Sequence, residues 1–277
     1  MKKNQHRRRA ARKNGAPVSE SLPGRRRQQI LERVRAAGAA KVADLAAEFG
    51  VSDMTVRRDL NQLVKDGELH KVHGGAELQQ DSSADEPGFQ SKSQLQLPEK
   101  AAIASAAAKL VEPGMSVSLT SGTTTFALAR ALRQIPRITV VTNSPRIADL
   151  LQDAPVEGQT VLLTGGMRTV SDALVGPLAT AAISSLHVDR CFMGVHGFSV
   201  EDGLSTPNMM EVEVNRLFLE RSNSNVLLAD HSKWGTKGLY RIAELAAIDT
   251  LITDDALSPA DVDAITEHIH DLRLEKA

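Results

Sequence analysis

Several short polar segments in the C-terminal part of the chain carry side chains that can bind a small anion. Thr120–Thr125 combines hydroxyl groups with Gly122 and precedes a helical pattern from Phe126 to Leu132. Unpaired N–H groups at a helix N-terminus, with hydroxyl groups beside them, suit a phosphate or similar anion. A capping turn without any ligand fits the same residues, because serine and threonine frequently cap helices.

Other polar segments follow predicted strands in the same way. They are Thr142–Ser144, Thr164–Met167, Gly194–Gly197 and Asp230–Lys233. Lys233 can contact a phosphate or a sugar hydroxyl, and it can equally form an ion pair with Asp230.

The pattern around these segments predicts the elements that position them. Strands are expected at residues 115–119, 138–142, 160–163, 189–193, 225–229 and 250–253, with helices between most of them. Such alternation favours an α/β fold with a mostly parallel, doubly wound sheet. Ligands of these sheets bind beyond the carboxyl ends of the strands, where the polar segments are placed.

The N-terminal part shows three helical patterns. Apolar residues recur at Ile30, Leu31 and Val34 in a first helix from Arg25 to Gly38, and the second helix has its apolar stripe at Val42, Leu45, Ala46 and Phe49. Gly50 then permits a sharp turn in the left-handed region.

The third helix, residues 52–63, has the features of a DNA-recognition helix. Ser52 is placed to cap it, and Val56, Leu60 and Leu63 form its inner face. The outer residues of such a helix enter the major groove of duplex DNA. We therefore expect DNA contacts from Ser52, Met54, Thr55, Arg57 and Arg58.

A strand over residues 68–75 follows and is expected to form a wing. It would bring Lys71 and His73 to the DNA backbone or minor groove. His70 and His73 have no third metal ligand nearby in the sequence, so no metal site is expected.

The charge is divided sharply along the chain. Residues 1–80 hold 17 Lys and Arg against 9 Asp and Glu, whereas the remainder holds 16 against 25. A basic N-terminal part is typical of a segment that meets a polyanion. No apolar run is long enough for a membrane helix or a signal peptide, so a cytoplasmic protein is expected. The single cysteine, Cys191, is interpreted as a core residue.

The composition suggests a basic disordered arm (residues 1–24), a winged helix-turn-helix domain (25–78), a linker (79–97) and an α/β domain (98–277). Residues Gly50–Leu60, followed by Asp66-Gly67 and His73–Ala76, resemble the signature of the DeoR family of bacterial sugar-metabolism regulators. The α/β domain resembles the family's sensor domain, which is similar in fold to ribose-5-phosphate isomerase.

The resemblance implies where an effector would bind. Ser121, Gly122, Thr123 and Thr124 would hold a phosphate, and Asn143, Gly165, Gly166 and Lys233 would surround a sugar. Two positions depart from the family pattern: Thr120 stands where an Asp is common, and Gly194–Gly197 replaces a GADG-like turn. His196 of that turn is also assigned to the effector site. The two missing carboxylates suggest a different sugar portion.

Three functional classes follow from these observations. The favoured one is a repressor of carbohydrate-metabolism genes, controlled by a phosphorylated sugar or related metabolite, which binds duplex operator DNA as a homodimer or homotetramer. A ligand-independent DNA-binding scaffold is the first alternative. The second is an isomerase-like enzyme, which is disfavoured because proton transfer needs a positioned base and the carboxylates are missing, although His196 could act as one. No catalytic residue and no cofactor are expected.

Overall fold

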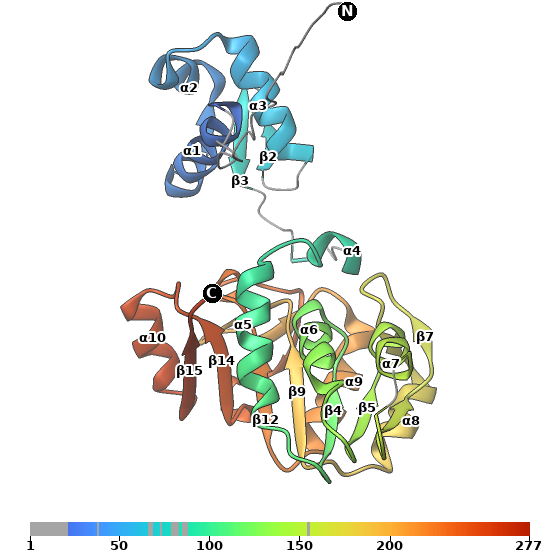
Figure 1. Ribbon diagram of the computed structural model, residues 1–277. Coiled ribbons are helices and arrows are strands. Elements are labelled where there is room, and N and C mark those ends of the chain that lie inside the picture. Colours follow the sequence, from blue (N-terminus) through green and yellow to red (C-terminus); the bar gives the residue numbers. More distant parts are fainter. Residues whose placement is uncertain are drawn as a thin grey trace, which may run out of the picture. The chain divides into compact units, whose positions relative to one another are not determined.

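The computed structural model describes residues 22–37, 39–65, 69–72, 74–78, 83–84, 88–153 and 156–277. Its contacts divide the chain into two units, residues 1–81 and 82–277 (Figure 1). We describe each unit by itself.

The first unit contains a helix-turn-helix and a small antiparallel sheet. The helices are α1 (Leu22–Ala37), α2 (Val42–Phe49) and α3 (Asp53–Lys65), and the strands are β1 (Ala39–Lys41), β2 (Leu69–Val72) and β3 (Gly75–Leu78), in the order β1-β3-β2. The winged helix-turn-helix expected from the sequence is therefore confirmed. Two details differ: α1 begins at Leu22 rather than Arg25, and β1 was not predicted.

The apolar spacing of the sequence explains how this unit packs. Ile30, Val34, Leu45, Val56 and Leu60 are buried in one shared core. Gly50 has a φ of 63° and donates its N–H to Ala46, so it ends α2 in the left-handed region as expected. A Cβ atom on Gly75 would lie 2.2 Å from the carbonyl oxygen of Ala40, so glycine is required where β3 meets β1.

The second unit is built on a seven-stranded sheet in which every strand pair is parallel. Its order is β15-β14-β12-β9-β4-β5-β6, with β4 (Ser116–Leu119), β5 (Thr139–Thr142), β6 (Thr160–Leu163), β9 (Arg190–Gly194), β12 (Asn225–Leu228), β14 (Thr250–Asp254) and β15 (Asp271–Glu275). The expected parallel sheet is confirmed, and β15 is an additional edge strand.

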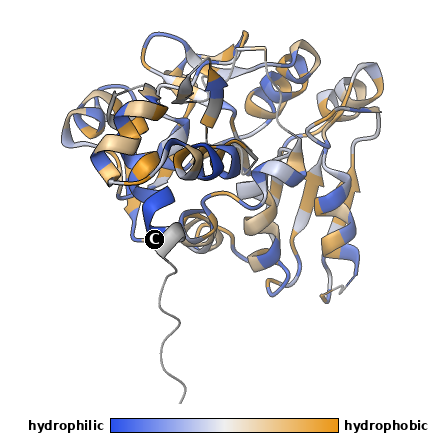
Figure 2. Cartoon of the chain, turned by 90° about the horizontal axis from the view of Figure 1, so that it is seen from above, coloured by the Kyte–Doolittle hydropathy of each residue, from blue (hydrophilic) through white to orange (hydrophobic). Residues whose placement is uncertain are grey.

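Helices cover both faces of this sheet. One face packs against α5 (Leu97–Ala108), α6 (Thr123–Leu132) and α7 (Pro145–Gln152), and the other against α8 (Pro177–Ser184), α9 (Met209–Glu220) and α10 (Pro259–Thr266). Strand β9 shows why both faces are apolar: Phe192 enters the first core, whereas Cys191 and Met193 enter the second. In Figure 2 hydrophobic and hydrophilic residues share single helices, as expected for helices with one buried side.

Two small antiparallel sheets accompany the main sheet, and neither was predicted. One joins β10 (Gly197–Ser199), β11 (Gly203–Thr206) and β13 (Tyr240–Ala243), and the other joins β7 (Met167–Arg168) and β8 (Leu174–Val175). Two 3₁₀ turns complete the unit, η1 (His231–Lys233) and η2 (Leu245–Ala247). These short elements bring distant side chains to the carboxyl ends of β4 and β9.

The predicted linker is partly incorporated in the second unit. Residues 89–92 form the short helix α4 (Phe89–Lys92), and Phe89 is buried with its ring centroid 5.6 Å from that of Phe126. The polar composition of residues 79–97 concealed this contact, because a single apolar residue gives no periodic signal. By its contacts, the second unit includes residues 88–96, which the sequence analysis assigned to the linker.

Within the described ranges, no helix is long and apolar enough to cross a membrane. In the same ranges, no group of three His, Cys, Asp or Glu side chains is arranged to hold a metal ion. Residues 1–21 of the predicted basic arm lie outside the described residues.

Candidate nucleic-acid interface and ligand pocket

Helix α3 presents one apolar and one polar side. Ser52 precedes it and accepts a hydrogen bond at Oγ from the backbone N–H of Thr55, at 3.3 Å. The hydroxyl groups of Ser52 and Thr55 also lie 3.0 Å apart, so these two predicted contact residues hold the start of the helix together. Val56 is buried, whereas Met54 is 71% exposed.

The polar side of α3 gathers the predicted DNA-binding residues. Met54, Arg57 and Arg58 line a shallow hollow together with Asn61 and Gln62, which the sequence analysis did not name. Lys71 of β2 donates to Oδ1 of Asn61 at 3.2 Å, which fixes the wing against the helix. His73 lies outside the described residues.

A partly buried ion pair anchors α3 to α1. Nε of Arg26 lies 2.6 Å from Oδ2 of Asp59, whose side chain is 5% exposed. Asp59 directly follows Arg58 in the sequence, so this contact sets how the helix presents its two exposed arginines. The arrangement matches a helix whose inner side packs while its outer side remains available for a nucleic acid.

A pocket in the second unit lies beyond the carboxyl ends of β4, β9 and β12. It is lined by Phe89 and Lys92 of α4, by residues 121–124 and 194–196, and by Ser171, Thr206, Pro207, Glu211, Asn215, Leu228, Lys233 and Ile242. Six predicted effector residues are therefore brought together: Ser121, Gly122, Thr123, Thr124, His196 and Lys233. This position agrees with the rule for parallel sheets.

The loop before α6 supplies the polar wall expected for an anion. Thr123 and Thr124 form the first turn of α6, where backbone N–H groups lack partners within the helix. Thr125 instead turns inward and donates to the carbonyls of Thr120 and Gly122, at 2.7 and 3.0 Å. Its hydroxyl therefore stabilises the loop and does not face the pocket.

Asn143 supports the pocket from behind. It is 1% exposed, its Oδ1 accepts from the backbone N–H of Ser121 at 2.8 Å, and its Nδ2 donates to the carbonyl of Leu174. Thr120 has a similar role, because its Oγ1 accepts from the backbone N–H of Gly194 at 3.0 Å. Both residues position the two loops that line the pocket, although neither belongs to its described lining.

Gly165 and Gly166 are also placed away from the described lining of the pocket. Both have positive φ, 75° and 119°, and a Cβ atom on Gly166 would lie 2.4 Å from the carbonyl oxygen of Val175. These glycines allow the connection after β6 to approach β8 closely. Their assignment to the sugar stays a prediction, and their positive φ values give them a conformational role as well.

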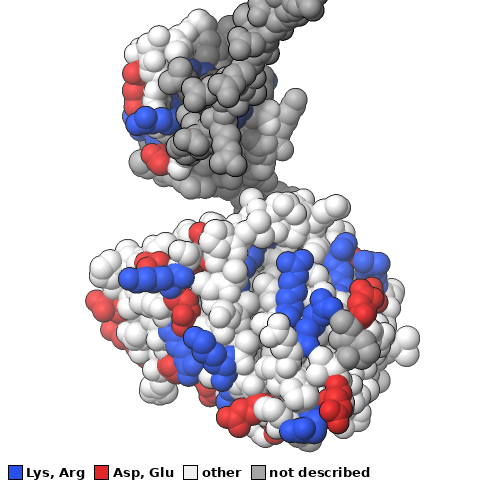
Figure 3. Space-filling model, in the orientation of Figure 1, with Lys and Arg blue, Asp and Glu red and all other residues white. Residues whose placement is uncertain are grey.

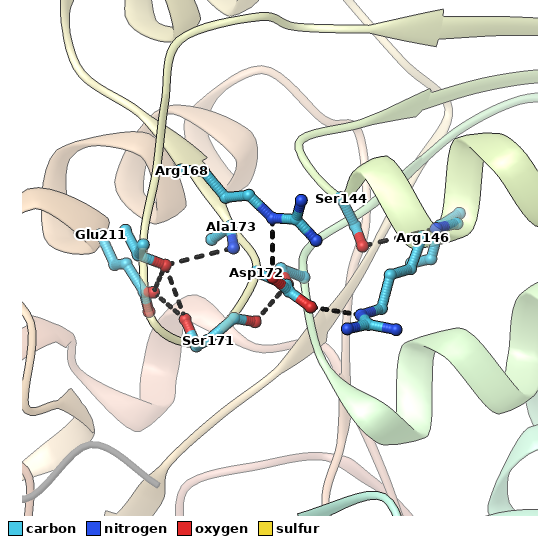
Figure 4. Close-up of polar contacts among 10 residues, drawn as sticks. Ser144, Arg146, Arg168, Ser171, Asp172, Ala173 and Glu211 are labelled. Carbon is cyan, nitrogen blue, oxygen red and sulfur yellow. Dashed lines mark hydrogen bonds and ion pairs between the residues drawn. The ribbon is translucent and has the colours of Figure 1, made fainter. Parts of the chain in front are cut away.

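A carboxylate that the sequence analysis missed lies in the pocket. Glu211 of α9 accepts hydrogen bonds from Thr169 and Thr206, at 3.0 and 3.3 Å, and from the hydroxyl of Ser171 (Figure 4). The two carboxylates missing at Thr120 and at Gly194–Gly197 therefore do not leave the pocket without a carboxylate. Residues 172–210 separate this glutamate from the loop it binds, so no local motif could have indicated it.

The loop containing Ser171 is fixed on its other side by two arginines. Asp172 accepts from Nε of Arg168 at 2.7 Å and from Nε of Arg146 of α7 (Figure 4). Burial would raise the pKa of Asp172, but the hydrogen bonds from these two arginines hold it below its usual value. The carboxylate is therefore ionised at neutral pH and holds the loop.

A buried lysine lies beside the cationic part of the pocket. Lys100 of α5 is 5% exposed, and its Nζ donates to the carbonyls of Lys92 and Leu95 at 2.7 and 2.6 Å. Burial lowers the pKa of Lys100 to about 8, with Asp230 opposing this shift and Lys233 and Lys92 adding to it. An anion bound nearby would favour the charged form of Lys100.

Asp230 does not neutralise Lys233 directly. Its Oδ1 accepts from the backbone N–H and the hydroxyl of Ser232, and among the described ion pairs none joins it to Lys233. The pairing that the sequence left open is thus not observed. Figure 3 shows basic and acidic side chains mixed on the face drawn, so the surface of the second unit lacks a uniformly basic face there.

Comparisons with known proteins assign the chain to a family. The model of the DeoR-like helix-turn-helix domain matches residues 26–82, and that of the DeoR C terminal sensor domain matches residues 95–255. The putative aga operon transcriptional repressor of Escherichia coli O157:H7 is 37% identical over 85% of this chain and 87% of that protein. The glycerol-3-phosphate regulon repressor of Escherichia coli K12 is 30% identical over 90% of this chain and 98% of that protein.

Among solved structures, ribose 5-phosphate isomerase A of Methanocaldococcus jannaschii matches 50% of this chain and 54% of its own. The identity is 19% and the TM-score is 0.36, which is too low to assign an activity. The two matched domain models agree with the helix-turn-helix and the α/β unit described above. The chain belongs to the DeoR family and is a DNA-binding transcription regulator.

Proposed function

We propose that this protein represses carbohydrate-metabolism genes and that a phosphorylated sugar or related metabolite controls its operator binding. The observation that carries the proposal is the polarity of the pocket. One part joins the N-terminus of α6 with Lys92 and Lys233, and another part holds Glu211 and Asn215. Cations and free N–H groups suit a phosphate, whereas a carboxylate and an amide suit sugar hydroxyl groups.

The names of two relatives support this proposal. One is described as a repressor of the aga operon and the other as a repressor of the glycerol-3-phosphate regulon. We propose the same class of control here, acting through Arg57, Arg58 and the wing residue Lys71 on duplex DNA. Paired recognition helices of a homodimer or homotetramer would read repeated half-sites.

The pocket is proposed to bind its ligand without converting it. Glu211 would be the base of an isomerase, because proton transfer between sugar carbons needs a positioned carboxylate. Three hydroxyl groups, from Thr169, Ser171 and Thr206, already donate to its two oxygens. Glu211 therefore holds the loop around the pocket. Turnover of a pentose or hexose phosphate that disappears in Glu211→Gln would contradict this assignment.

A ligand titration tests the proposal directly. Trp234 is the only tryptophan of the chain and directly follows Lys233 of the pocket lining, so its fluorescence is the optical signal chosen for the titration. We expect pentose and hexose phosphates to change this fluorescence and to raise Tm, because they bind the folded state. The corresponding unphosphorylated sugars should bind at least tenfold more weakly.

Lys233→Ala should weaken sugar phosphate binding about tenfold or more, since one charge-assisted contact contributes roughly 1.5–3 kcal/mol. Lys237→Ala is the matched control, because Lys237 is 62% exposed and pairs with Asp202. Operator affinity without ligand should be unchanged in both variants. If no sugar phosphate altered Tm or operator affinity, the ligand-independent scaffold would be the better description.

A further inference from the structure

Strand β6 forms one edge of the seven-stranded sheet, and no strand in the described ranges pairs with its outer side. Thr160 donates its backbone N–H to the carbonyl of Ile138, which directly precedes β5, at 2.9 Å. Because backbone groups alternate in direction along a strand, the N–H and C=O groups of Val161 and Leu163 point away from β5. The outer side of β6 therefore presents donors and acceptors that a further strand can satisfy.

The side chains of β6 do not protect this edge from another strand. Leu162 and Leu163 are 43% and 45% exposed, and successive side chains of a strand point to opposite faces of the sheet. Each face of the edge strand therefore exposes a leucine. Edge strands that stay unpaired usually carry charged side chains or a proline, and the sequence TVLL of β6 contains neither.

The opposite edge of the sheet is charged. Strand β15 has the sequence DLRLE, and Nη2 of Arg273 lies 2.8 Å from Oδ2 of Asp271. If β15 paired along its whole length with an antiparallel copy of itself, Asp271 would face Glu275 and Arg273 would face another arginine. Like charges directly opposite each other destabilise a strand pair. Charge therefore opposes this pairing at β15 and permits it at β6.

The apolar surface continues on the elements that follow β6. Met167 of β7 is 57% exposed and Leu178 of α8 is 73% exposed. Met167 and Met210 both reach Gly176, where a Cβ atom would lie 3.8 and 3.7 Å from their Cε atoms. Both β7 and α8 lie on the side of the second unit away from β15 (Figure 1). A stable interface buries about 800 Å² per partner, so a contact at β6 needs such neighbouring apolar side chains.

We propose that β6 pairs in antiparallel orientation with β6 of a second copy of this chain, across a two-fold axis, and so joins two seven-stranded sheets into one. An uncharged strand is complementary to its own copy, and a two-fold axis closes the assembly without leaving this edge open to further chains. The inference rests on the proposed function for the expectation of a homo-oligomer, and it names the surface that forms the dimer or one contact of the tetramer.

Backbone geometry determines the register of this pairing. Residues that exchange both backbone hydrogen bonds must point outward on both strands. The register that uses both outward residues of β6 joins Val161 to Leu163 of the second copy. Leu162 then lies at the two-fold axis, opposite Leu162 of the second copy, with the two Cα atoms about 4.5 Å apart. Apolar contacts therefore form on both faces of the joined sheet.

Leu162→Glu and Leu162→Lys test this pairing, because each variant places two like charges at the axis. The mass of the full chain in solution is measured by sedimentation equilibrium over a dilution series. Each variant alone should dissociate to half the wild-type mass, with its association Kd raised at least about tenfold. An equal mixture of the two variants should recover the wild-type mass, because Glu then faces Lys. That recovery also requires both variants to be folded.

Leu274→Glu is the matched control, since Leu274 is 44% exposed on the other edge strand, and it should keep the wild-type mass. Hydrogen exchange gives a second measurement: the backbone N–H groups of Val161 and Leu163 should exchange at least about tenfold more slowly in the wild type than in Leu162→Glu.

The outcomes separate this inference from the proposed function. If the wild type were oligomeric and Leu162→Glu kept the same mass, the pairing at β6 would be wrong while the proposed homo-oligomer stood. If both charged variants dissociated and their mixture did not recover the wild-type mass, the register at Leu162 would be overturned. A wild type that was monomeric with and without operator DNA would contradict the proposed homo-oligomer itself.

Discussion

Arg57 is the residue that we propose to link α3 to DNA most directly. It is exposed on the polar side of the helix. It lines two surface hollows, and Asn61 lines both of them as well. A guanidinium at this position can bind a guanine edge or a phosphate.

Arg57→Ala should weaken operator binding about 10- to 100-fold at matched salt, because one such contact contributes roughly 1–3 kcal/mol. Fluorescence anisotropy with operator and scrambled duplexes provides the measurement. Equal losses on both duplexes would indicate a phosphate contact, and loss on operator alone a base contact. Arg33→Ala is the control, since Arg33 is exposed on α1 and pairs with Glu48. Unchanged operator affinity in Arg57→Ala would contradict the placement of α3 in the groove.

The residues that sequence alone located best are those whose neighbours are close in sequence. Ser52, Val56 and Arg57 occupy their expected sides of α3 because a helical period relates them. The contacts of Asn143 and Glu211 could not be predicted, because their partners Ser121 and Ser171 are distant in sequence. Hydrogen-bond partners of this kind leave no local pattern.

At the scale of elements, the region where α4, α5 and η1 meet predicts that the affinity for an anion depends on pH. Lys100 is surrounded by Lys92, Glu99, Asp230 and Lys233, and burial lowers its pKa to about 8. A bound anion must raise that pKa. Below pH 8 the lysine is charged with or without ligand, so affinity is constant there. Above pH 8 binding requires proton uptake, so affinity falls as pH rises.

Titration of the wild type with inorganic phosphate from pH 8 to 9.5 measures this effect by Trp234 fluorescence, since phosphate is mainly dianionic in that range. Phosphate affinity should fall by up to tenfold per pH unit above pH 8. Lys100→Met should bind weakly with little dependence on pH, whereas Lys109→Met, at the exposed end of α5, should follow the wild type. A wild-type affinity that rose above pH 8 would contradict the assignment.

The lowered pKa of Lys100 also makes the stability of the ligand-free protein depend on pH. Its folded state releases the Lys100 proton near pH 8, whereas the unfolded chain retains it until about pH 10.5. The unfolded state therefore binds more protons in that window, and this group adds stability as pH rises from 8 to 10.5.

The main elements were predictable from their periodicity, but the small ones were not. The six expected strands of the sheet are observed, since buried parallel strands have continuous apolar runs. Strand β7 consists only of Met167 and Arg168, and α4 contains four residues with one buried side chain. Such short elements are stabilised by their contacts with neighbouring elements.

For the whole molecule, the two ligands of a regulator must influence each other equally. An effector that weakens operator binding by a given factor is itself bound more weakly by the operator complex by that factor. Isothermal titration of the sugar phosphate, with and without saturating operator duplex, measures this factor. Equal effector affinity with and without operator would exclude coupling between the units.

By itself, the sequence determined the winged helix-turn-helix, the parallel α/β sheet and the polar segments at its carboxyl edge. Each follows from apolar residues that recur every 3.6 residues in a helix or every 2 in a strand, or from a capping residue at the end of an element. Only the tertiary structure decided which polar residues share a pocket, placing Glu211, Lys92 and Phe89 there and Asn143 behind it. Hydrogen bonds and buried contacts between distant segments arise when the sheet brings strand ends together, and no spacing along the chain encodes them.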